Sequence, residues 1–136
     1  MKEKVLIDTS VWIDFLNGRD TLGRVAVRHF IASGAKIYLC PTILQEVLQG
    51  IRNDRDYIKV QLSLMSFTML EINPVDAAIK AADLYRDLRK KGLTVRKSHD
   101  CLIAIHAILY NLPLLHNDKD FDSIAKGSDL KIVQLN

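Results

Sequence analysis

Short apolar runs alternate with longer amphipathic stretches along the chain, and this alternation predicts an α/β fold. Strands are expected where the short apolar runs lie, at residues 5–7, 36–40, 68–72, 113–116 and 131–135. Helices are expected between them, over 9–18, 21–34, 54–67, 73–91 and 98–110, in a stretch that opens at 42, and briefly within 118–125. Strands that alternate with helices are typical of a parallel sheet covered on both faces.

Local signals predict where several helices begin. Thr9 or Ser10 is expected to cap the first helix, and Ser98 the helix over 98–110. Thr42, followed three residues later by Gln45, has the spacing of a capping box. The inward faces are also predicted. They are formed by Leu22, Val25, Ala26 and Phe30 in the second helix, and by Tyr57, Val60 and Leu64 in the helix over 54–67, with Met65 as a further candidate.

Composition agrees with one globular domain over residues 1–136. Hydrophobic residues make up 49% of the chain and charged residues 26%, which is ordinary for a soluble protein. We find neither a signal peptide nor an apolar stretch of membrane-spanning length, so a cytoplasmic location without a membrane is expected. Cys40 and Cys101 lie far apart in the sequence, and we expect two buried free thiols in a reducing compartment. The net charge of +3 is too small to identify a nucleic-acid partner by itself.

Four carboxylates fall at the ends of predicted strands or at the starts of predicted helices. Asp8 ends the first strand, Glu46 lies early in the helix after the second strand, Asp100 opens the central helix, and Asp118 follows the strand at 113–116. The carboxyl ends of parallel strands share one edge of a sheet, where ligands bind. We therefore expect these four acids to meet, although any one of them taken alone could simply cap a helix.

Four carboxylates in one cleft repel one another and raise one another's pKa unless a cation joins them. Their ligand atoms are oxygens, with no set of Cys or His beside them, which favours Mg²⁺ or Mn²⁺ over Zn²⁺. Such an ion activates water and stabilises phosphate oxygens, so cleavage of a phosphodiester is the expected reaction. The Ser10 hydroxyl could orient a phosphate or a water, or could serve only as a helix cap.

A run of basic residues leads into Asp100. Its members are Arg86, Arg89, Lys90, Lys91, Arg96 and Lys97. Such a run could be a solvated helix face, or it could bind the phosphate backbone of RNA. Both interpretations stay open from the sequence, with Arg96 and Lys97 as the candidate substrate-binding residues because they lie closest to Asp100.

Four segments in order resemble the motifs of PIN-domain ribonucleases, in particular VapC-type toxins of toxin–antitoxin pairs. They are "LIDTSVWIDFL", "PTILQEVLQGIR", "TVRKSHDCLIAIHA" and "LLHNDKDFDSIA". The resemblance implies a three-layer α/β/α fold, with a mostly parallel five-stranded sheet in the order 3-2-1-4-5. It also implies Mg²⁺- or Mn²⁺-dependent endonucleolytic cleavage of RNA, a homodimer, and a VapB-type antitoxin whose tail covers the active site.

Matched position by position, the resemblance places the family's acidic set at Asp8, Glu46, Asp100 and Asp118. Of these, we assign Asp8, Asp100 and Asp118 to the metal. Ser10 matches the family's hydroxyl position, and Asp120 could assist Asp118.

Several alternatives compete with this interpretation. Asp118, Asp120 and Asp122 have the spacing of an EF-hand start, but Ser123 stands where the calcium loop needs glycine. A haloacid-dehalogenase-like phosphatase needs a second Asp where this chain has Ser10. The remaining rival is a PIN-like module that binds RNA or protein without catalysis.

Two further residues have alternative roles. His99 could contact substrate, or it could be an ordinary residue at a helix start. Trp12 could pack in the core, or it could stack on a base.

Overall fold

A four-stranded parallel sheet forms the centre of the molecule, in the order β3-β2-β1-β4. In the computed structural model, which describes residues 2–135, the strands are β1 (Lys4–Ile7), β2 (Lys36–Leu39), β3 (Thr68–Met69) and β4 (Leu114–Leu115). Leu6 is paired with Tyr38 of β2 on one side and with Leu114 of β4 on the other. The parallel sheet and the α/β class are therefore as predicted.

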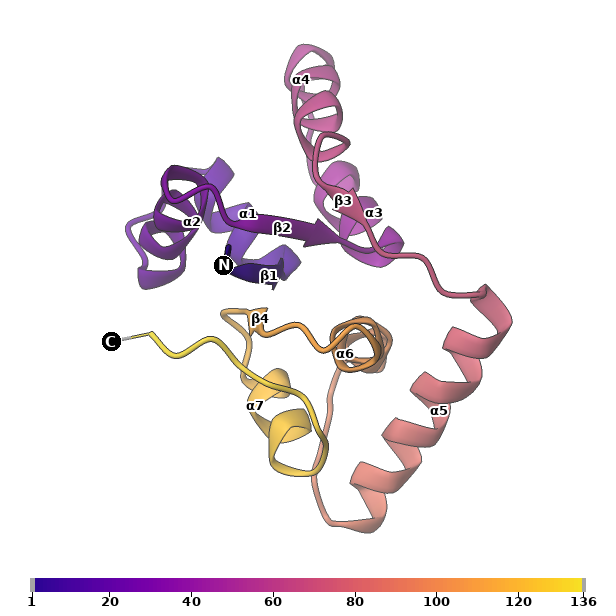
Figure 1. The fold of residues 1–136 in the computed structure, drawn as a ribbon. Coiled ribbons are helices and arrows are strands. Elements are labelled where there is room, and N and C mark those ends of the chain that lie inside the picture. The colour runs from indigo at the N-terminus through magenta and orange to yellow at the C-terminus, as the bar shows by residue number, and fades with distance from the viewer. Residues whose placement is uncertain (1, 136) are drawn as a thin grey trace.

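Helices follow the strands, and most of their contacts fall in two groups, which are joined where α3 packs against α6 (Figure 1). The helices are α1 (Thr9–Leu16), α2 (Leu22–Ala32), α3 (Pro41–Gln49), α4 (Asp54–Leu64), α5 (Pro74–Lys90), α6 (His99–Leu109) and α7 (Lys119–Lys126). In one group α1 contacts α2 and α3, and α3 contacts α4; in the other, α6 contacts α5 and α7. Over the described residues, none of these helices combines the length and the apolar character that crossing a bilayer requires.

One hydrophobic core joins the sheet to the helices, and β1 and α6 are among its most buried elements. Residues 5–7 of β1 are fully buried, as expected for a strand covered on both faces. Helix α6 buries seven of its eleven residues, which agrees with the nearly all-apolar sequence of this helix. Trp12 is also buried and packs against Phe15 and Phe67, so its core-packing role is confirmed, and it is not exposed to stack on a base.

The predicted fifth strand is not formed in the described part of the chain. The sheet there has four strands, and the predicted number of five is wrong. Ile132 makes only an isolated parallel bridge with Leu114. The backbone N–H of Leu114 donates to Lys131, and that of Val133 donates to Leu114. The segment thus lies at the predicted edge of the sheet, beside β4. Because β4 itself has only two residues, it offers too few backbone groups to extend the ladder.

Three predicted helix caps need correction. Asp8, and neither Thr9 nor Ser10, caps α1, because the Asp8 carboxylate accepts the backbone N–H of Ser10. Helix α3 begins at a proline one residue before Thr42, so the expected capping box is absent there. Proline suits the first position of a helix because the N–H it lacks would have no partner there. Ser98 stands at the start of α6, but within residues 2–135 its side chain caps nothing.

The inward face of α2 agrees with the predicted one only in part, at Phe30 and at Ala26, which packs against the core. Val27 and Phe30 are buried with Gly23, whereas Leu22 is 58% exposed and Val25 is 59% exposed. A Cβ at Gly23 would lie 3.3 Å from the Val11 side chain, so glycine at this position allows α2 to approach α1 closely. Gly23 therefore lies on the face of α2 that packs against α1, and Leu22 lies outside that face.

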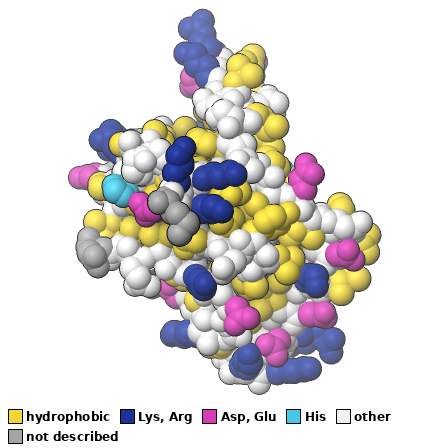
Figure 2. All heavy atoms as spheres, in the orientation of Figure 1, with side chains coloured by type: hydrophobic (Ala, Val, Ile, Leu, Met, Phe, Trp, Pro, Cys, Tyr) yellow, Lys and Arg dark blue, Asp and Glu magenta, His cyan; other side chains and the backbone are white. Residues whose placement is uncertain are grey.

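The prediction for α4 is confirmed at Leu64, which is buried, and at Val60, which is half-buried against the core, whereas Tyr57 is 38% and Met65 54% exposed. The exposed apolar side chains of the molecule include Ile58 and Leu62 on α4 and Val75 and Ile79 on α5. Figure 2 shows that, on the face in view, apolar side chains cover much of the surface between scattered charged ones.

Candidate metal centre

Asp8 lies at the carboxyl end of β1, as predicted. Its backbone N–H donates to Leu115 of β4, and its side chain caps α1. One carboxylate oxygen, Oδ2, accepts bonds from the Ser10 backbone N–H at 3.0 Å and from the Ser10 hydroxyl at 2.6 Å. Burial raises the pKa of Asp8, although both bonds from Ser10 act to lower it. Ser10 is therefore a close partner of Asp8, in addition to its place in the first turn of α1.

Three carboxylates meet next to Asp8. Asp100, Asp118 and Asp120 each offer one oxygen, and these oxygens lie within 4.8 Å of one another. Asp100 comes from the first turn of α6, Asp118 caps α7, and Asp120 lies in the first turn of α7. Two helix starts thus bring together residues that are about twenty positions apart in the sequence. Because residues 119–126 form a helix, the segment does not form the calcium loop of an EF-hand.

Asp100 is buried and lies near the negative charges of three other acids. It is 3% exposed, and its Oδ2 has no hydrogen-bond partner among the described residues. Burial, together with the negative charges of Asp8, Asp118 and Asp120, raises its pKa to about 7. A buried carboxylate oxygen without a partner costs free energy unless a proton or a cation satisfies it.

Asp118 has both of its oxygens occupied. Oδ1 accepts the backbone N–H of Asp120 at 3.0 Å, and Oδ2 is bonded to the ammonium of Lys97. Burial acts to raise the pKa of Asp118, but the bonds from Lys97 and Asp120 outweigh it and the pKa is lowered. The same contact with Asp118 raises the pKa of Lys97. At neutral pH this contact is therefore an ion pair.

Asp120 is buried beneath the loop that precedes α6. Its Oδ2 accepts the backbone N–H of Arg96 at 3.1 Å and that of Lys97 at 3.0 Å. The Arg96 guanidinium lies 3.6 Å from the other oxygen, and the Arg96 side chain is 73% exposed. Asp120 thus fixes the backbone of this loop, and the loop in turn places the Lys97 side chain on Asp118.

Glu46 lies close to this cluster but outside it. Thr9 donates from its hydroxyl to Glu46 Oε1 at 2.9 Å, and the His99 Nε2 lies 2.9 Å from Oε2. The same Nε2 is 3.7 Å from Asp100, so His99 stands between two of the predicted acids. His99 is therefore part of the site. The sequence does not predict this role of Thr9, because the bond joins residues 37 positions apart.

A second polar network joins the start of α1 to the loop before α7. The backbone N–H of Asn117 donates to the Ser10 hydroxyl at 3.0 Å, and its side-chain amide donates to Asp14 at 3.0 Å. Asp14 is buried and also accepts a bond from Arg19 at 3.3 Å. Sequence reasoning missed Asp14 and Asn117. A carboxylate within the apolar run "SVWIDFL" was the available signal, because a buried charge needs partners.

Among the residues described, the compact cluster holds two of the three predicted metal ligands, Asp100 and Asp118, and adds Asp120. Asp8 lies outside it, yet close enough for its charge to raise the Asp100 pKa. The donors are carboxylate oxygens, which suit Mg²⁺ or Mn²⁺, and the unpartnered Asp100 oxygen is free to receive one. The residues therefore fit a hard divalent cation.

The cysteines do not add ligands to this centre. Both are buried free thiols within residues 2–135, as predicted. Burial raises the pKa of Cys40 to about 12 and that of Cys101 to about 11. Neither thiol is therefore ionised at neutral pH, and a thiolate is the form that binds zinc.

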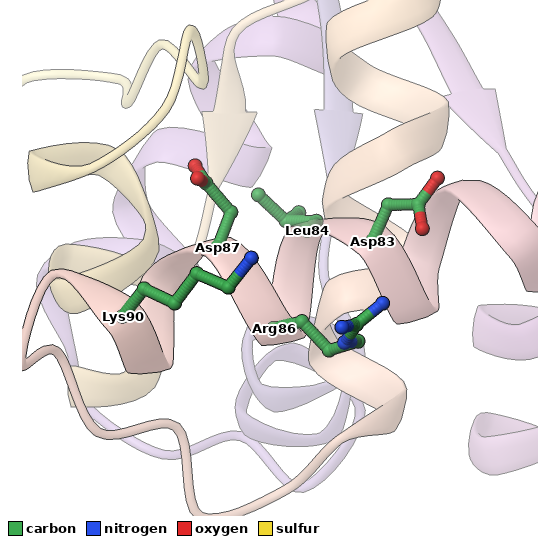
Figure 3. A pocket seen from close by; sticks show the side chains of 5 residues that line it. All are labelled: Asp83, Leu84, Arg86, Asp87 and Lys90. Carbon is green, nitrogen blue, oxygen red and sulfur yellow. The ribbon is translucent and has the colours of Figure 1, made fainter.

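Most of the basic run lies away from the cluster of Asp100, Asp118 and Asp120. Figure 3 shows a hollow on α5, lined by Asp83, Leu84, Arg86, Asp87 and Lys90. Acidic and basic side chains alternate there, and Lys91 pairs with Asp87 at 3.0 Å. This part of the run is a solvated helix face with balanced charges. Only Arg96 and Lys97 of the run contact the acidic cluster.

Known proteins resemble the chain in both sequence and fold. The sequence profile of the PIN domain matches residues 5–127. The chain is 33% identical over 128 residues to Ribonuclease VapC11 of Mycobacterium tuberculosis, and the match spans 93% of this chain and 96% of that protein. It is 30% identical over 128 residues to Ribonuclease VapC of Rickettsia bellii, spanning 88% and 90% respectively.

The fold is similar to that of solved toxin–antitoxin complexes. VapBC2 from Rickettsia felis, bound to a DNA fragment from its promoter, superposes with a TM-score of 0.73 at 18% identity, over 98% of this chain and 99% of that one. VapBC-1 from nontypeable Haemophilus influenzae gives a TM-score of 0.71 at 22% identity, over 96% of each chain. These likenesses concern the fold, and they agree with the sheet described above.

Proposed function

This chain belongs to the PIN-domain family, and from that premise we propose that it is an endoribonuclease, the toxin of a VapBC-type pair. The observation that carries the proposal is the cluster of Asp100, Asp118 and Asp120, with an unpartnered buried oxygen on Asp100. Two relatives at 30% identity or more bear the name ribonuclease VapC, which supports the same reaction class.

Asp8, Asp100 and Asp118 would hold a divalent cation, with Asp120 assisting. When bound, Mg²⁺ or Mn²⁺ lowers the pKa of a water ligand and stabilises negative charge on phosphate oxygens. The all-carboxylate donor set supports this choice of ion. Asp8 is included because its charge reaches Asp100, although its Oδ2 is engaged by Ser10.

The other residues orient the reacting groups. Thr9 and His99 hold the two Glu46 oxygens in a fixed direction, so that this carboxylate can accept a proton from an attacking water. Arg96 and Lys97 stand at the edge of the cluster with exposed side chains, where they can bind phosphates of an RNA backbone. Ser10 keeps Asp8 aligned through its short hydroxyl bond.

The proposed partners are a VapB-type antitoxin and a second copy of the chain. The structural neighbours are VapBC complexes, which supports an antitoxin partner. Exposed apolar side chains on α4 and α5 provide surface that association would bury. We also propose a reducing, cytoplasmic location, supported by the two buried free thiols.

Incubation of the purified protein with total RNA tests the proposal. Cleavage is expected with Mg²⁺ or Mn²⁺ and is expected to stop with EDTA. The variant Asp100→Asn should lose at least about a hundredfold in rate, because it removes a proposed ligand of the cation. Asp129→Asn, an exposed acid outside the cluster, is the matched control and should cleave as the wild type does.

Undiminished cleavage by Asp100→Asn, or cleavage in EDTA, would contradict the proposal. A protein that binds RNA but never cleaves it would instead be the non-catalytic PIN-like module.

A further inference from the structure

Lys97 is held against the acidic cluster from two directions. Its ammonium is bonded to Asp118 Oδ2. Its own backbone N–H, together with that of Arg96, donates to the buried Asp120 carboxylate. The side chain is 53% exposed, so its position depends on these contacts with two acids rather than on burial in the core. A flexible lysine held in this way acts as a local positive charge for the cluster.

The positions of the carboxylate oxygens show what this charge does. Each oxygen of Asp118 already has a partner, because Oδ1 accepts the Asp120 N–H and Oδ2 accepts a bond from the Lys97 ammonium. The charge of Lys97 also lowers the pKa of Asp100, against the charges of the other acids. Arg96 is the only other lysine or arginine paired with the cluster in the described chain, and it lies 3.6 Å from Asp120 on the outer side.

We propose that Lys97 is an internal counter-ion of the metal centre, which a divalent cation displaces from Asp118. This inference rests on the proposed function, since it requires a cation at the cluster. A cation that binds Asp118 through Oδ2 meets the ammonium at the same oxygen, so the two positive groups compete for one ligand. Lys97 therefore lowers the affinity of the centre for metal while it makes the metal-free cluster tolerable.

Displacement of the Lys97 ammonium from Asp118 makes it available to bind substrate. Once it leaves Asp118, the Lys97 ammonium stands beside the cluster on a flexible, half-exposed stem and is available to a phosphate oxygen. Metal binding and RNA binding are thereby linked, because the ion releases the group that contacts RNA. The metal-free protein keeps this lysine occupied.

Isothermal titration with Mn²⁺ tests the competition. Lys97→Met keeps the apolar stem and removes the charge, and we expect it to bind Mn²⁺ about five- to tenfold more tightly than the wild type. Arg96→Met removes the same charge one residue away, at a greater distance from Asp118, and should change the affinity by less than about twofold. Lys97→Gln serves as a second variant if the methionine variant folds poorly.

The outcomes separate the inference from the function on which it rests. Equal tightening in Lys97→Met and Arg96→Met would show only a general charge effect and would overturn the inference. Unchanged or weaker Mn²⁺ binding by both Lys97 variants would also overturn it, provided that the wild type binds Mn²⁺ and Asp100→Asn does not. If the wild type itself fails to bind Mn²⁺, the metal centre and the inference fall together.

Discussion

At the residue scale, the surroundings of Asp100 determine whether its carboxyl group holds a proton or binds a cation. It is buried at the start of α6, it has one oxygen without a partner, and three other carboxylates surround it. A helix start stabilises a negative charge by about 0.3–1 kcal/mol, which is too little to offset burial and three like charges. The metal-free protein therefore holds a proton on Asp100 more firmly than an unfolded chain does.

This proton makes stability depend on pH. The folded pKa of Asp100 is raised from 3.8 to about 7, so between these values the folded chain binds more protons than the unfolded chain. The contribution of Asp100 to stability is thus present at low pH and is lost as the pH rises toward 7. In EDTA, Asp100→Asn should be more stable than the wild type by about 1–3 kcal/mol at pH 8, and the difference should shrink toward pH 4.

Urea unfolding of both proteins between pH 4 and pH 8 measures this difference. Asp129→Asn, whose acid is exposed, should follow the wild type throughout. A difference between Asp100→Asn and wild type that stays constant with pH would show that Asp100 does not titrate in this range.

At the element scale, two junctions between strands and helices carry acids of the site, in addition to the start of α6 that carries Asp100. One joins β1 to α1 and carries Asp8, while the other joins β4 to α7 and carries Asp118. Asn117 connects them, because its N–H reaches Ser10 and its amide reaches the buried Asp14. The loop before α7 is therefore held directly by α1.

Removal of the Asn117 side chain tests this connection. Asn117→Ala leaves one oxygen of the buried Asp14 without its donor, and we expect a loss of about 1–3 kcal/mol in the free energy of unfolding. RNA cleavage should fall as well, since the loop that places Asp118 is released. Asn17→Ala, at the exposed end of α1, is the control and should cost less than about 0.5 kcal/mol. Equal losses in the two variants would argue against the connection.

At the scale of the whole molecule, the sequence pattern predicts the scaffold better than it predicts the contacts. The alternation of apolar runs predicts the parallel sheet, and the positions of Asp8, Asp100 and Asp118 after strands or at helix starts bring them to one region. The bonds from Thr9 to Glu46 and from Asn117 to Asp14 join residues 37 and 103 positions apart. No local pattern encodes such pairs.

The errors in the predicted elements also arise from contacts between residues that are not neighbours in the sequence. The apolar spacing predicts Leu22 and Val25 on the inward face of α2, whereas in the structure Gly23 packs against Val11 and both side chains are exposed. The apolar run at 131–135 has the composition of a strand, but the two-residue strand β4 beside it limits the pairing to one bridge. In both cases a neighbour distant in sequence overrides the local preference.

A crystal structure of the protein grown with Mn²⁺, with the ion located by its anomalous scattering, would decide whether the acidic cluster is a metal centre. We expect one or more Mn²⁺ ions in contact with Asp100 and Asp118, and a Lys97 ammonium that has moved off Asp118. A Mn²⁺ ion bound elsewhere, or an acidic cluster that stays empty with Lys97 still on Asp118 at saturating Mn²⁺, would contradict this expectation.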